Sequence, residues 1–250
     1  METEPLKENT PVSDGQIREG PWSCTYKEGN LLIKKYRYWV PSEAQREAKA
    51  SQAVYGRGIN TPLFYETRES ESEISNVFEY VDIRSIDELE ILKNERFRYQ
   101  ISLIINRLAE IPWNEPDDYW RTSLMQEFEF ALSFLNTDIN CNRYLHFLKD
   151  LTPAVFIHGD FTCQNMGITT TDDVVLFDFQ HGSFGPRGWD KSYLASTFCP
   201  NQFFLPLSQE ERMMAETISA IRYGRGIKKD TDDLSKREEL YQLWHISNCL

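Results

Sequence analysis

Phe156–Asn165 reads F-I-H-G-D-F-T-C-Q-N, and the interpretation of the whole chain depends on this stretch. An apolar run from Ala154 to Ile157 leads into a histidine, a glycine and an aspartate, and an asparagine follows five positions after the aspartate. A short apolar run of this kind predicts a buried strand. A strand that ends in His, Asp and Asn at this spacing has two interpretations, a polar turn or a catalytic loop.

The segment that follows adds a second oxygen-bearing side chain. A short strand from Met166, a polar turn and the run V-V-L-F-D-F-Q at 174–180 predict a strand–turn–strand unit. This unit would place Asn165 at one root of the hairpin and Asp178 at the other. Mg²⁺ prefers carboxylate, amide and phosphate oxygens, so the pair suits a metal–nucleotide site. Asp160 is then left to accept a proton from an incoming hydroxyl group.

Phosphoryl-transfer enzymes of the kinase type use the same residues in the same order, H-x-D-x-x-x-x-N followed by D-F-x. Here the first motif runs from His158 to Asn165, and the second is Asp178-Phe179-Gln180. Gln180 stands where protein kinases have the glycine of D-F-G. The first motif alone is a weak signal. Joined to D-F at a matching distance and to G-x-x-G-W-D beyond it, it favours a catalytic loop over a polar turn.

Three segments, H-G-D-F-T-C-Q-N, L-F-D-F-Q and G-P-R-G-W-D-K-S-Y-L-A, resemble the aminoglycoside phosphotransferase and choline kinase family of small-molecule kinases. The strong part of the resemblance covers about 155–196. Gly159, in place of the arginine of most protein kinases, points to this branch. The resemblance implies an α+β class and a bilobal protein-kinase-like fold, with a small β-sheet N-lobe carrying one helix and a larger, mainly helical C-lobe.

The order of the predicted elements agrees with two lobes, because a small sheet with one helix precedes a mainly helical part. The predicted strands are 22–27, 31–36, a short strand in 58–66, 74–81 and 154–157, besides the hairpin at 166–180, and the predicted helices are 42–55, 85–94, 97–111, 119–136, 143–151, 208–223 and 233–247. We expect residues 1–15 to be a disordered lead-in, residues 16–81 to form the nucleotide-binding lobe, and residues 82–250 to form the catalytic and substrate-binding lobe.

The resemblance implies a role for each matching residue of the C-terminal motifs. Asp160 would be the catalytic base that orients and deprotonates the acceptor hydroxyl. Asn165 and Asp178 would be the metal ligands. His158 and Asp190 would give structural support to the catalytic loop through hydrogen bonds, without touching the substrate.

In the N-lobe the family uses a strand lysine, held by a helical glutamate, to reach the phosphates. L-L-I-K at 31–34 nominates Lys34. Lys35 is the rival, because a shift of one residue along a strand moves the side chain to the other face. On the helix that begins near Ser42, Glu47 is the expected partner of the lysine, and Glu43 is the alternative nearer the helix start.

Two further segments would contact the nucleotide. V-F-E-Y-V at 77–81 resembles the connector of the family, where backbone groups of Glu79 and Val81 would bond adenine. The phosphate-covering loop is occupied by E-G-P-W-S-C-T instead of a G-x-G-x-x-G run, and Gly20 and Ser23 are the candidates that would offer N–H groups to the phosphates. An ordinary turn is an equal interpretation of that loop.

Composition limits the partners. The formal charge of −12 argues against a nucleic-acid or anionic-membrane surface, because phosphate binding needs clustered Lys and Arg. The sequence shows neither an apolar run near the roughly 20 residues that span a bilayer nor a hydrophobic signal core, so we expect a cytoplasmic protein without a membrane partner. Five dispersed cysteines without a C-x-x-C pair indicate neither a disulfide framework nor a zinc site.

The sequence therefore predicts an ATP-dependent phosphotransferase that moves the γ-phosphate to a hydroxyl of a small molecule, with ATP and Mg²⁺ as cofactors and an aminoglycoside-, choline- or sugar-like acceptor. The alternative is a catalytically degenerate kinase-like protein that binds a nucleotide or a protein partner. The identity of the acceptor, the choice between ATP and GTP and the oligomeric state stay open.

Overall fold

The structure is a computed structural model and describes residues 15, 17–19, 23–36, 41–71, 73–113, 119–120, 124–135, 141–229, 236, 238–240 and 242–243. The chain divides into two compact units, one from Met1–Ile86 and Met166–Gln180, the other from Asp87–Asn165 and His181–Leu250. Apart from Gly15, the predicted lead-in lies outside the described residues. Gly20 and most of the predicted helix 233–247 lie outside them as well.

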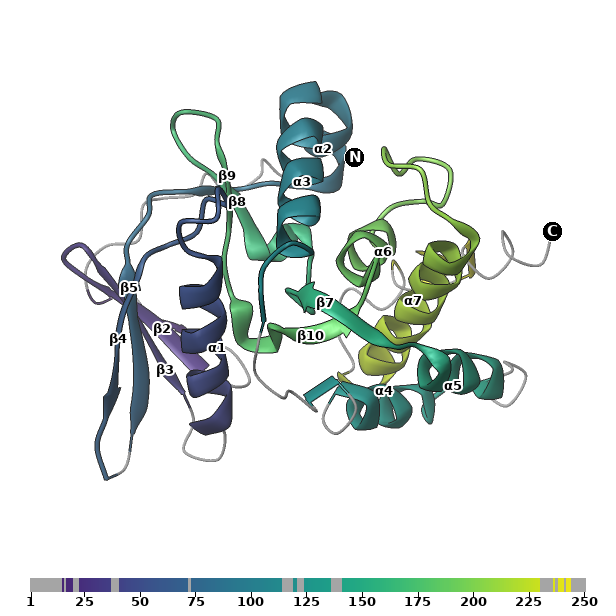
Figure 1. The fold of residues 1–250 in the computed structure, drawn as a ribbon, viewed down its shortest axis with the longest axis horizontal. Coiled ribbons are helices and arrows are strands. Elements are labelled where there is room, and N and C mark those ends of the chain that lie inside the picture. The colour runs from purple at the N-terminus through teal and green to yellow at the C-terminus, as the bar shows by residue number, and fades with distance from the viewer. Residues whose placement is uncertain are drawn as a thin grey trace, which may run out of the picture. The chain divides into compact units, whose positions relative to one another are not determined.

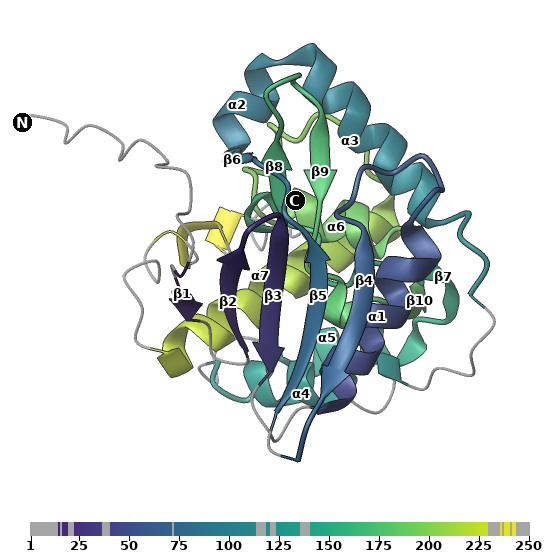
Figure 2. The ribbon, with the colours of Figure 1, turned by 90° about the vertical axis from the view of Figure 1, so that its left-hand side faces the viewer.

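The first unit contains an antiparallel sheet of five strands in the order β1-β2-β3-β5-β4 (Figure 2). The strands are β1 (Ile17–Glu19), β2 (Ser23–Glu28), β3 (Leu31–Tyr36), β4 (Phe64–Glu69) and β5 (Ile74–Glu79). The predicted hairpin is confirmed as β2 and β3, which join at a turn where Gly29 has a φ of +56°. A positive φ is easily adopted only by residues without a Cβ, which explains glycine at this turn. Strand β1 is not among the predicted elements.

Helix α1 (Pro41–Val54) covers one face of this sheet (Figure 1). The helix begins at Pro41, one residue before the predicted start at Ser42. Proline suits the first helical position because its fixed φ is already helical. Ala44, Ala48 and Val54 are buried. Tyr55, the last residue of the predicted helix, follows the helix end and is 52% exposed.

A three-stranded sheet also belongs to the first unit. It consists of β6 (Arg84–Ser85), β8 (Met166–Ile168) and β9 (Val174–Leu176), in the order β6-β8-β9. Leu176 N–H donates to the carbonyl of Asn60 at 2.9 Å, which ties this hairpin to the N-terminal segment. The sequence places 166–180 in the C-terminal lobe, whereas the structure groups it with the first unit because of these contacts.

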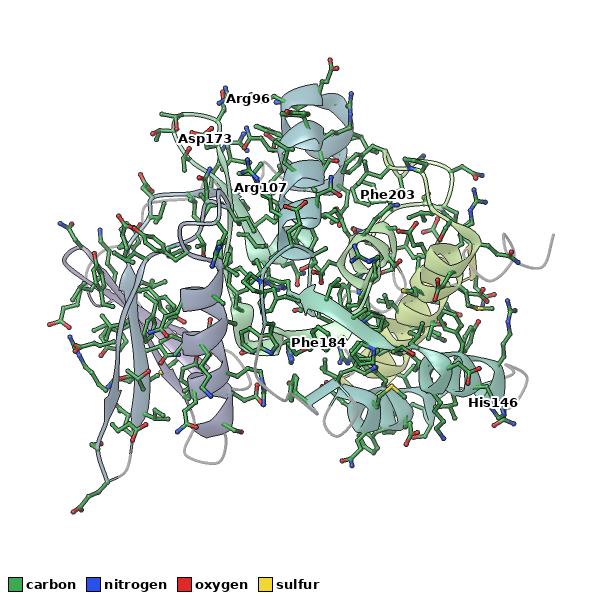
Figure 3. The ribbon with its side chains drawn as sticks, in the orientation of Figure 1. Arg96, Arg107, His146, Asp173, Phe184 and Phe203 are labelled. Carbon is green, nitrogen blue, oxygen red and sulfur yellow. The ribbon has the colours of Figure 1, made fainter. Side chains whose placement is uncertain are left out.

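The strand expected over 174–180 ends at Leu176, because Asp178 has a φ of +67° and a short 3-10 helix spans Phe179–His181. A residue in the left-handed region cannot continue an extended strand. Asp173, at the other end of β9, closes the turn after β8 (Figure 3).

The second unit is mainly helical. Its elements are α2 (Glu88–Lys93), α3 (Glu95–Leu108), α4 (Met125–Leu132), α5 (Cys141–Asp150), β7 (Pro153–Ile157), a 3-10 helix (Cys163–Asn165), β10 (Ser183–Pro186), α6 (Trp189–Ala195) and α7 (Gln209–Lys229). Strand β7 is the predicted buried strand before His158, and it pairs antiparallel with β10, which carries Phe184 (Figure 3). Of the predicted helix 119–136, the described part is Tyr119–Trp120 and the shorter α4. β10 and α6 are not among the predicted elements.

An aromatic cluster forms part of the core beside α6. Trp189 is fully buried, with its ring centroid 4.5 Å from that of Trp120 and 5.5 Å from that of Phe128. The predicted α+β class is confirmed, with an antiparallel sheet and one helix in the first unit and a helical second unit. Within the described residues, no helix has both the length and the hydropathy of a membrane-spanning segment.

Candidate active site

In the first unit, Lys34 is the centre of a buried polar cluster. Its Nζ lies 2.8 Å from Glu47 Oε2 on α1 and 2.7 Å from Asp178 Oδ1 beyond β9. It also donates to Gln180 Oε1 at 3.4 Å. The Lys34 residue is only 8% exposed, so these three oxygens replace the water that its ammonium would otherwise bind.

Burial and charge act in opposite directions on this cluster. Burial alone would lower the pKa of Lys34, but the carboxylates of Asp178 and Glu47 together outweigh it, and the pKa of Lys34 is raised. Burial raises the pKa of Glu47 to about 7, and the charge of Lys34 limits that rise. Lys34 is therefore a cation at neutral pH.

The structure decides between the alternatives that the sequence left open. Lys35 pairs with Glu73 at 2.9 Å on the other face of β3, and it does not reach Glu47. Glu43 pairs instead with Arg46, at 3.0 Å. The lysine that meets the helical glutamate is therefore Lys34, and the glutamate is Glu47.

A pocket of about 390 Å³ opens beside this cluster in the first unit. Its lining includes Ser23, Lys34, Glu47, Glu79, Val81 and Asp178. The backbone N–H groups of Glu79 and Tyr80 donate to Leu63 and Asn30, both at 2.8 Å. The N–H of Val81 makes no hydrogen bond to a described residue. A backbone donor at Val81 thus lies at the pocket, and Glu79 lines the same pocket.

The second unit contains the loop from His158 to Asn165. Asn165 Nδ2 donates to the carbonyl oxygen of Asp160 at 2.8 Å and to its Oδ2 at 3.0 Å. With the amide nitrogen on this side, Asn165 Oδ1 has no hydrogen-bond donor among the described residues. Asp160 is half-buried, and its carboxylate meets the hydroxyl of Tyr193 as well as the amide of Asn165.

Asp190 at the start of α6 holds the beginning of this loop. Its Oδ2 accepts from His158 N–H at 2.8 Å, and its Oδ1 accepts from Gly159 N–H at 3.0 Å. Burial raises the pKa of Asp190, although His158 and these two N–H groups oppose the rise. His158 Nδ1 in turn accepts from Asp160 N–H at 3.3 Å. These contacts are of the supporting kind that we expected for His158 and Asp190.

Gly159 is required by the path of the chain between these two residues. Its φ is +84°, and a Cβ placed on it would lie 2.5 Å from the carbonyl oxygen of His181. Both constraints exclude a side chain. Gly159 distinguishes this loop from the H-R-D loop of protein kinases, and the two constraints give a local physical reason for the difference.

Three residues near these groups were not predicted from the sequence. Gln180 was noted only as a departure from D-F-G, and Arg46, which donates to its carbonyl oxygen at 3.5 Å, was not noted at all. Tyr193 was not a predicted site residue; it is buried, and burial, the charge of Asp160 and a side-chain hydrogen bond to Asp160 raise the pKa of its phenol. Arg225 also lies 3.5 Å from its hydroxyl. The sequence signal that could have pointed to Gln180 is its departure from the glycine of D-F-G.

No group of three or more His, Cys, Asp or Glu side chains that could bind a metal occurs among the described residues. A magnesium–nucleotide site does not need one, since Mg²⁺ is usually held by one or two protein oxygens together with phosphates and water. Asn165 in the second unit and Asp178 in the first each carry an oxygen of the kind that Mg²⁺ prefers. Asp178 offers a 35% exposed side chain at the pocket, and Asn165 offers its unused Oδ1.

The model of the phosphotransferase enzyme family matches residues 10–213, most of the chain, and the chain therefore belongs to that family, whose members act on small molecules. A comparison with curated proteins gave no match.

Solved structures with the same fold include three small-molecule kinases. The choline kinase LicA from Streptococcus pneumoniae is 14% identical, with a TM-score of 0.64 and coverage of 96% of this chain and 94% of LicA. An ethanolamine kinase from Plasmodium vivax is 15% identical, with a TM-score of 0.56 and coverage of 94% and 81%. The aminoglycoside phosphotransferase APH(3'')-Id from Streptomyces rimosus is 15% identical, with a TM-score of 0.56 and coverage of 85% and 92%. LicA has also been solved in complex with AMP.

Proposed function

We propose that the chain transfers the γ-phosphate of ATP to a hydroxyl group of a small molecule. The observation that carries the proposal is Lys34, a buried cation fixed by Glu47 and Asp178 at the wall of a 390 Å³ pocket. In a family of phosphotransferases, a permanently charged and fixed lysine in a pocket is a group that stabilises phosphate charge.

The pocket would bind ATP through the connector after β5. Adenine presents an N–H donor and a ring-nitrogen acceptor side by side, and these match the carbonyl of Glu79 and the unused N–H of Val81. Guanine presents a carbonyl and an N–H in the reverse order, so the same two groups favour adenine. Ser23, at the start of β2, lines the pocket and would meet the phosphates. The first unit would then be the nucleotide-binding part of the chain.

We assign the metal ligands to Asn165 and Asp178. Met166 pairs with Leu176 in the hairpin, so Asn165 immediately precedes the strand end that Asp178 follows by two residues. Bound Mg²⁺ would offset the negative charge of the phosphates. The chain supplies one amide and one carboxylate oxygen for this purpose.

Asp160 would be the base. Asn165 donates to its backbone carbonyl and to one carboxylate oxygen, and the carboxylate would accept the proton of the acceptor hydroxyl as that hydroxyl attacks phosphorus. Asp190 and His158 would keep this loop in place.

The acceptor would be an amino alcohol, an aminoglycoside or a sugar. The names of the solved relatives include choline kinase, ethanolamine kinase and aminoglycoside phosphotransferase, and these define the first compounds to test. The second unit, which contains Asp160, would bind the acceptor.

The test is a transfer assay with Mg²⁺ and ATP over a panel of choline, ethanolamine, aminoglycosides and sugars. Asp160→Asn should lower transfer by about 10²- to 10⁴-fold, the usual contribution of a general base, and should keep nucleotide binding. Asp150→Asn makes the same chemical change at an exposed helix end and should keep full activity. Transfer unaffected by Asp160→Asn would contradict the mechanism. Nucleotide binding without transfer to any acceptor would favour a catalytically degenerate binding protein.

A further inference from the structure

We propose that Gln180 is a positioning residue for Lys34. Its side-chain amide oxygen would keep the ammonium group directed at the pocket when Asp178 serves the metal–nucleotide. The effect of Gln180 on catalysis rests on the proposed function. The contacts that support it belong to the first unit alone and are independent of that function.

Lys34 uses all the hydrogen-bond donors of its ammonium group. An ammonium group has three N–H donors and no acceptor. In this structure the three donors of Lys34 face three oxygens, those of Glu47 at 2.8 Å, Asp178 at 2.7 Å and Gln180 at 3.4 Å. Lys34 is thus saturated by protein acceptors, two of which are carboxyl groups while the third is an amide.

Asp178 would serve two cations, Lys34 and the metal. The proposed function gives its carboxylate a second duty as a metal ligand, and an oxygen that serves a cation has less charge to offer Lys34. A phosphate oxygen would then take one N–H of Lys34. If Gln180 were absent, Glu47 would remain as the only hydrogen-bond acceptor for Lys34 among the described residues, beside the ring of Tyr36, whose centroid lies 5.3 Å from Nζ. One hydrogen bond does not fix the direction of a long, flexible side chain. Gln180 supplies the second contact.

Gln180 is held by Arg46 of α1. Arg46 Nη1 donates to its backbone carbonyl at 3.5 Å, and Arg46 is itself held by Glu43 at 3.0 Å. Both residues lie on α1, which also carries Glu47. The helix that carries the charged partner of Lys34 therefore also fixes the residue that carries its neutral partner.

This arrangement explains the departure from D-F-G. A glycine at position 180 would keep the backbone carbonyl for Arg46, but it would remove the acceptor for Lys34. Glutamine also adds no third carboxylate to a cluster in which burial already raises the pKa of Glu47.

The first experiment uses the nucleotide-free chain, so it does not depend on activity. The side-chain ammonium of Lys34 is observed by NMR with ¹⁵N-lysine labelling, and its signal is identified by its absence in Lys34→Met. In Gln180→Met, which keeps the length of the side chain but lacks the oxygen, we expect hydrogen exchange at Lys34 to accelerate by about 2- to 10-fold, the effect of one ordinary hydrogen bond. Gln180→Glu keeps an acceptor and should restore the protection.

Gln52→Met is the matched control. It makes the same chemical change at a residue that is exposed on α1 and does not face Lys34. Its exchange should equal that of the unmodified chain. An unchanged exchange rate in Gln180→Met, or equal acceleration in Gln52→Met, would overturn the inference.

The second experiment measures kcat and the KM for ATP in the steady state. Gln180→Met should lower kcat by about 2- to 10-fold and change the KM for ATP by less, since the contact matters most when the phosphoryl charge develops. Gln180→Glu should recover part of kcat. A loss confined to KM would contradict the positioning role. If the unmodified chain transfers no phosphate, the proposed function fails, while the exchange measurement still decides the role of Gln180 toward Lys34.

Discussion

At the scale of single residues, Gly159 combines a backbone and a steric constraint in the middle of the catalytic loop. The left-handed conformation costs an alanine about 1–2 kcal/mol. The missing space at the His181 carbonyl adds a steric term, because backbone atoms cannot rotate away. The loop conformation that presents Asp160 therefore depends on glycine at this position.

We predict that Gly159→Ala lowers the free energy of unfolding by clearly more than the roughly 1–2 kcal/mol of the left-handed conformation. Gly56→Ala is the matched control, because Gly56 has a φ of +74° and a Cβ added there would meet nothing within 4 Å. Urea unfolding of both variants measures the difference, and the transfer assay measures whether the loop still works. Equal losses in the two variants would show that His181 moves aside at no cost.

The residues proposed for the chemistry could be nominated from the sequence because they occur at fixed spacings along one short segment. The choice between Lys34 and Lys35 was not decidable from the sequence, since alternation shows which residues share a face but not which face meets α1. Gln180 and Arg46 were missed for a different reason. They are 134 residues apart, and no local pattern records a contact of that range.

At the scale of elements, α7 and α4 approach each other closely at Gly224. A Cβ on Gly224 would lie 2.1 Å from the carbonyl oxygen of Ala131, which is a backbone atom of α4. Glycine costs a helix about 1 kcal/mol relative to alanine, so its presence inside α7 is explained by the helix crossing and not by helix propensity.

We predict that Gly224→Ala destabilises the chain by about 1–3 kcal/mol, the usual cost of overpacking, although alanine is the better helix former. Gln209→Ala, at the exposed beginning of the same helix, should change stability by less than about 0.5 kcal/mol. Thermal and urea unfolding measure both variants. A stabilised Gly224→Ala chain would mean that the two helices separate without loss of packing.

The elements that the sequence predicted well have a strong local signal. The hairpin of β2 and β3 has alternation and a glycine turn, and α3 has a helical apolar period and an N-cap, Asn94, that accepts from two N–H groups. The missed elements lack such signals. β10 is four residues long and exists by pairing with β7, and α6 follows Gly188 without a side-chain cap. Tertiary contacts, not local preference, decide these elements.

At the scale of the whole molecule, two compact units share one chain, and the proposed function gives them different ligands. Lys34, Glu47, Glu79 and Val81 belong to the first unit, whereas Asp160 belongs to the second. A ligand that binds the native state alone stabilises it in proportion to the logarithm of its concentration. Nucleotide binding therefore offers a way to test the division of labour without a known acceptor.

We predict that ATP with Mg²⁺, at about 100 times its Kd, stabilises the chain by about 2.7 kcal/mol and slows hydrogen exchange first in β2, β5 and α1, which line the pocket. Asp160→Asn should retain this stabilisation at the same ATP concentration, because Asp160 acts on the acceptor. Lys34→Met should lose most of it, because the phosphates lose their cation. Thermal unfolding and hydrogen-exchange mass spectrometry measure both effects. Slowed exchange confined to the helices of the second unit, or a Lys34→Met variant stabilised as strongly as the unmodified chain, would show that the nucleotide does not occupy this pocket.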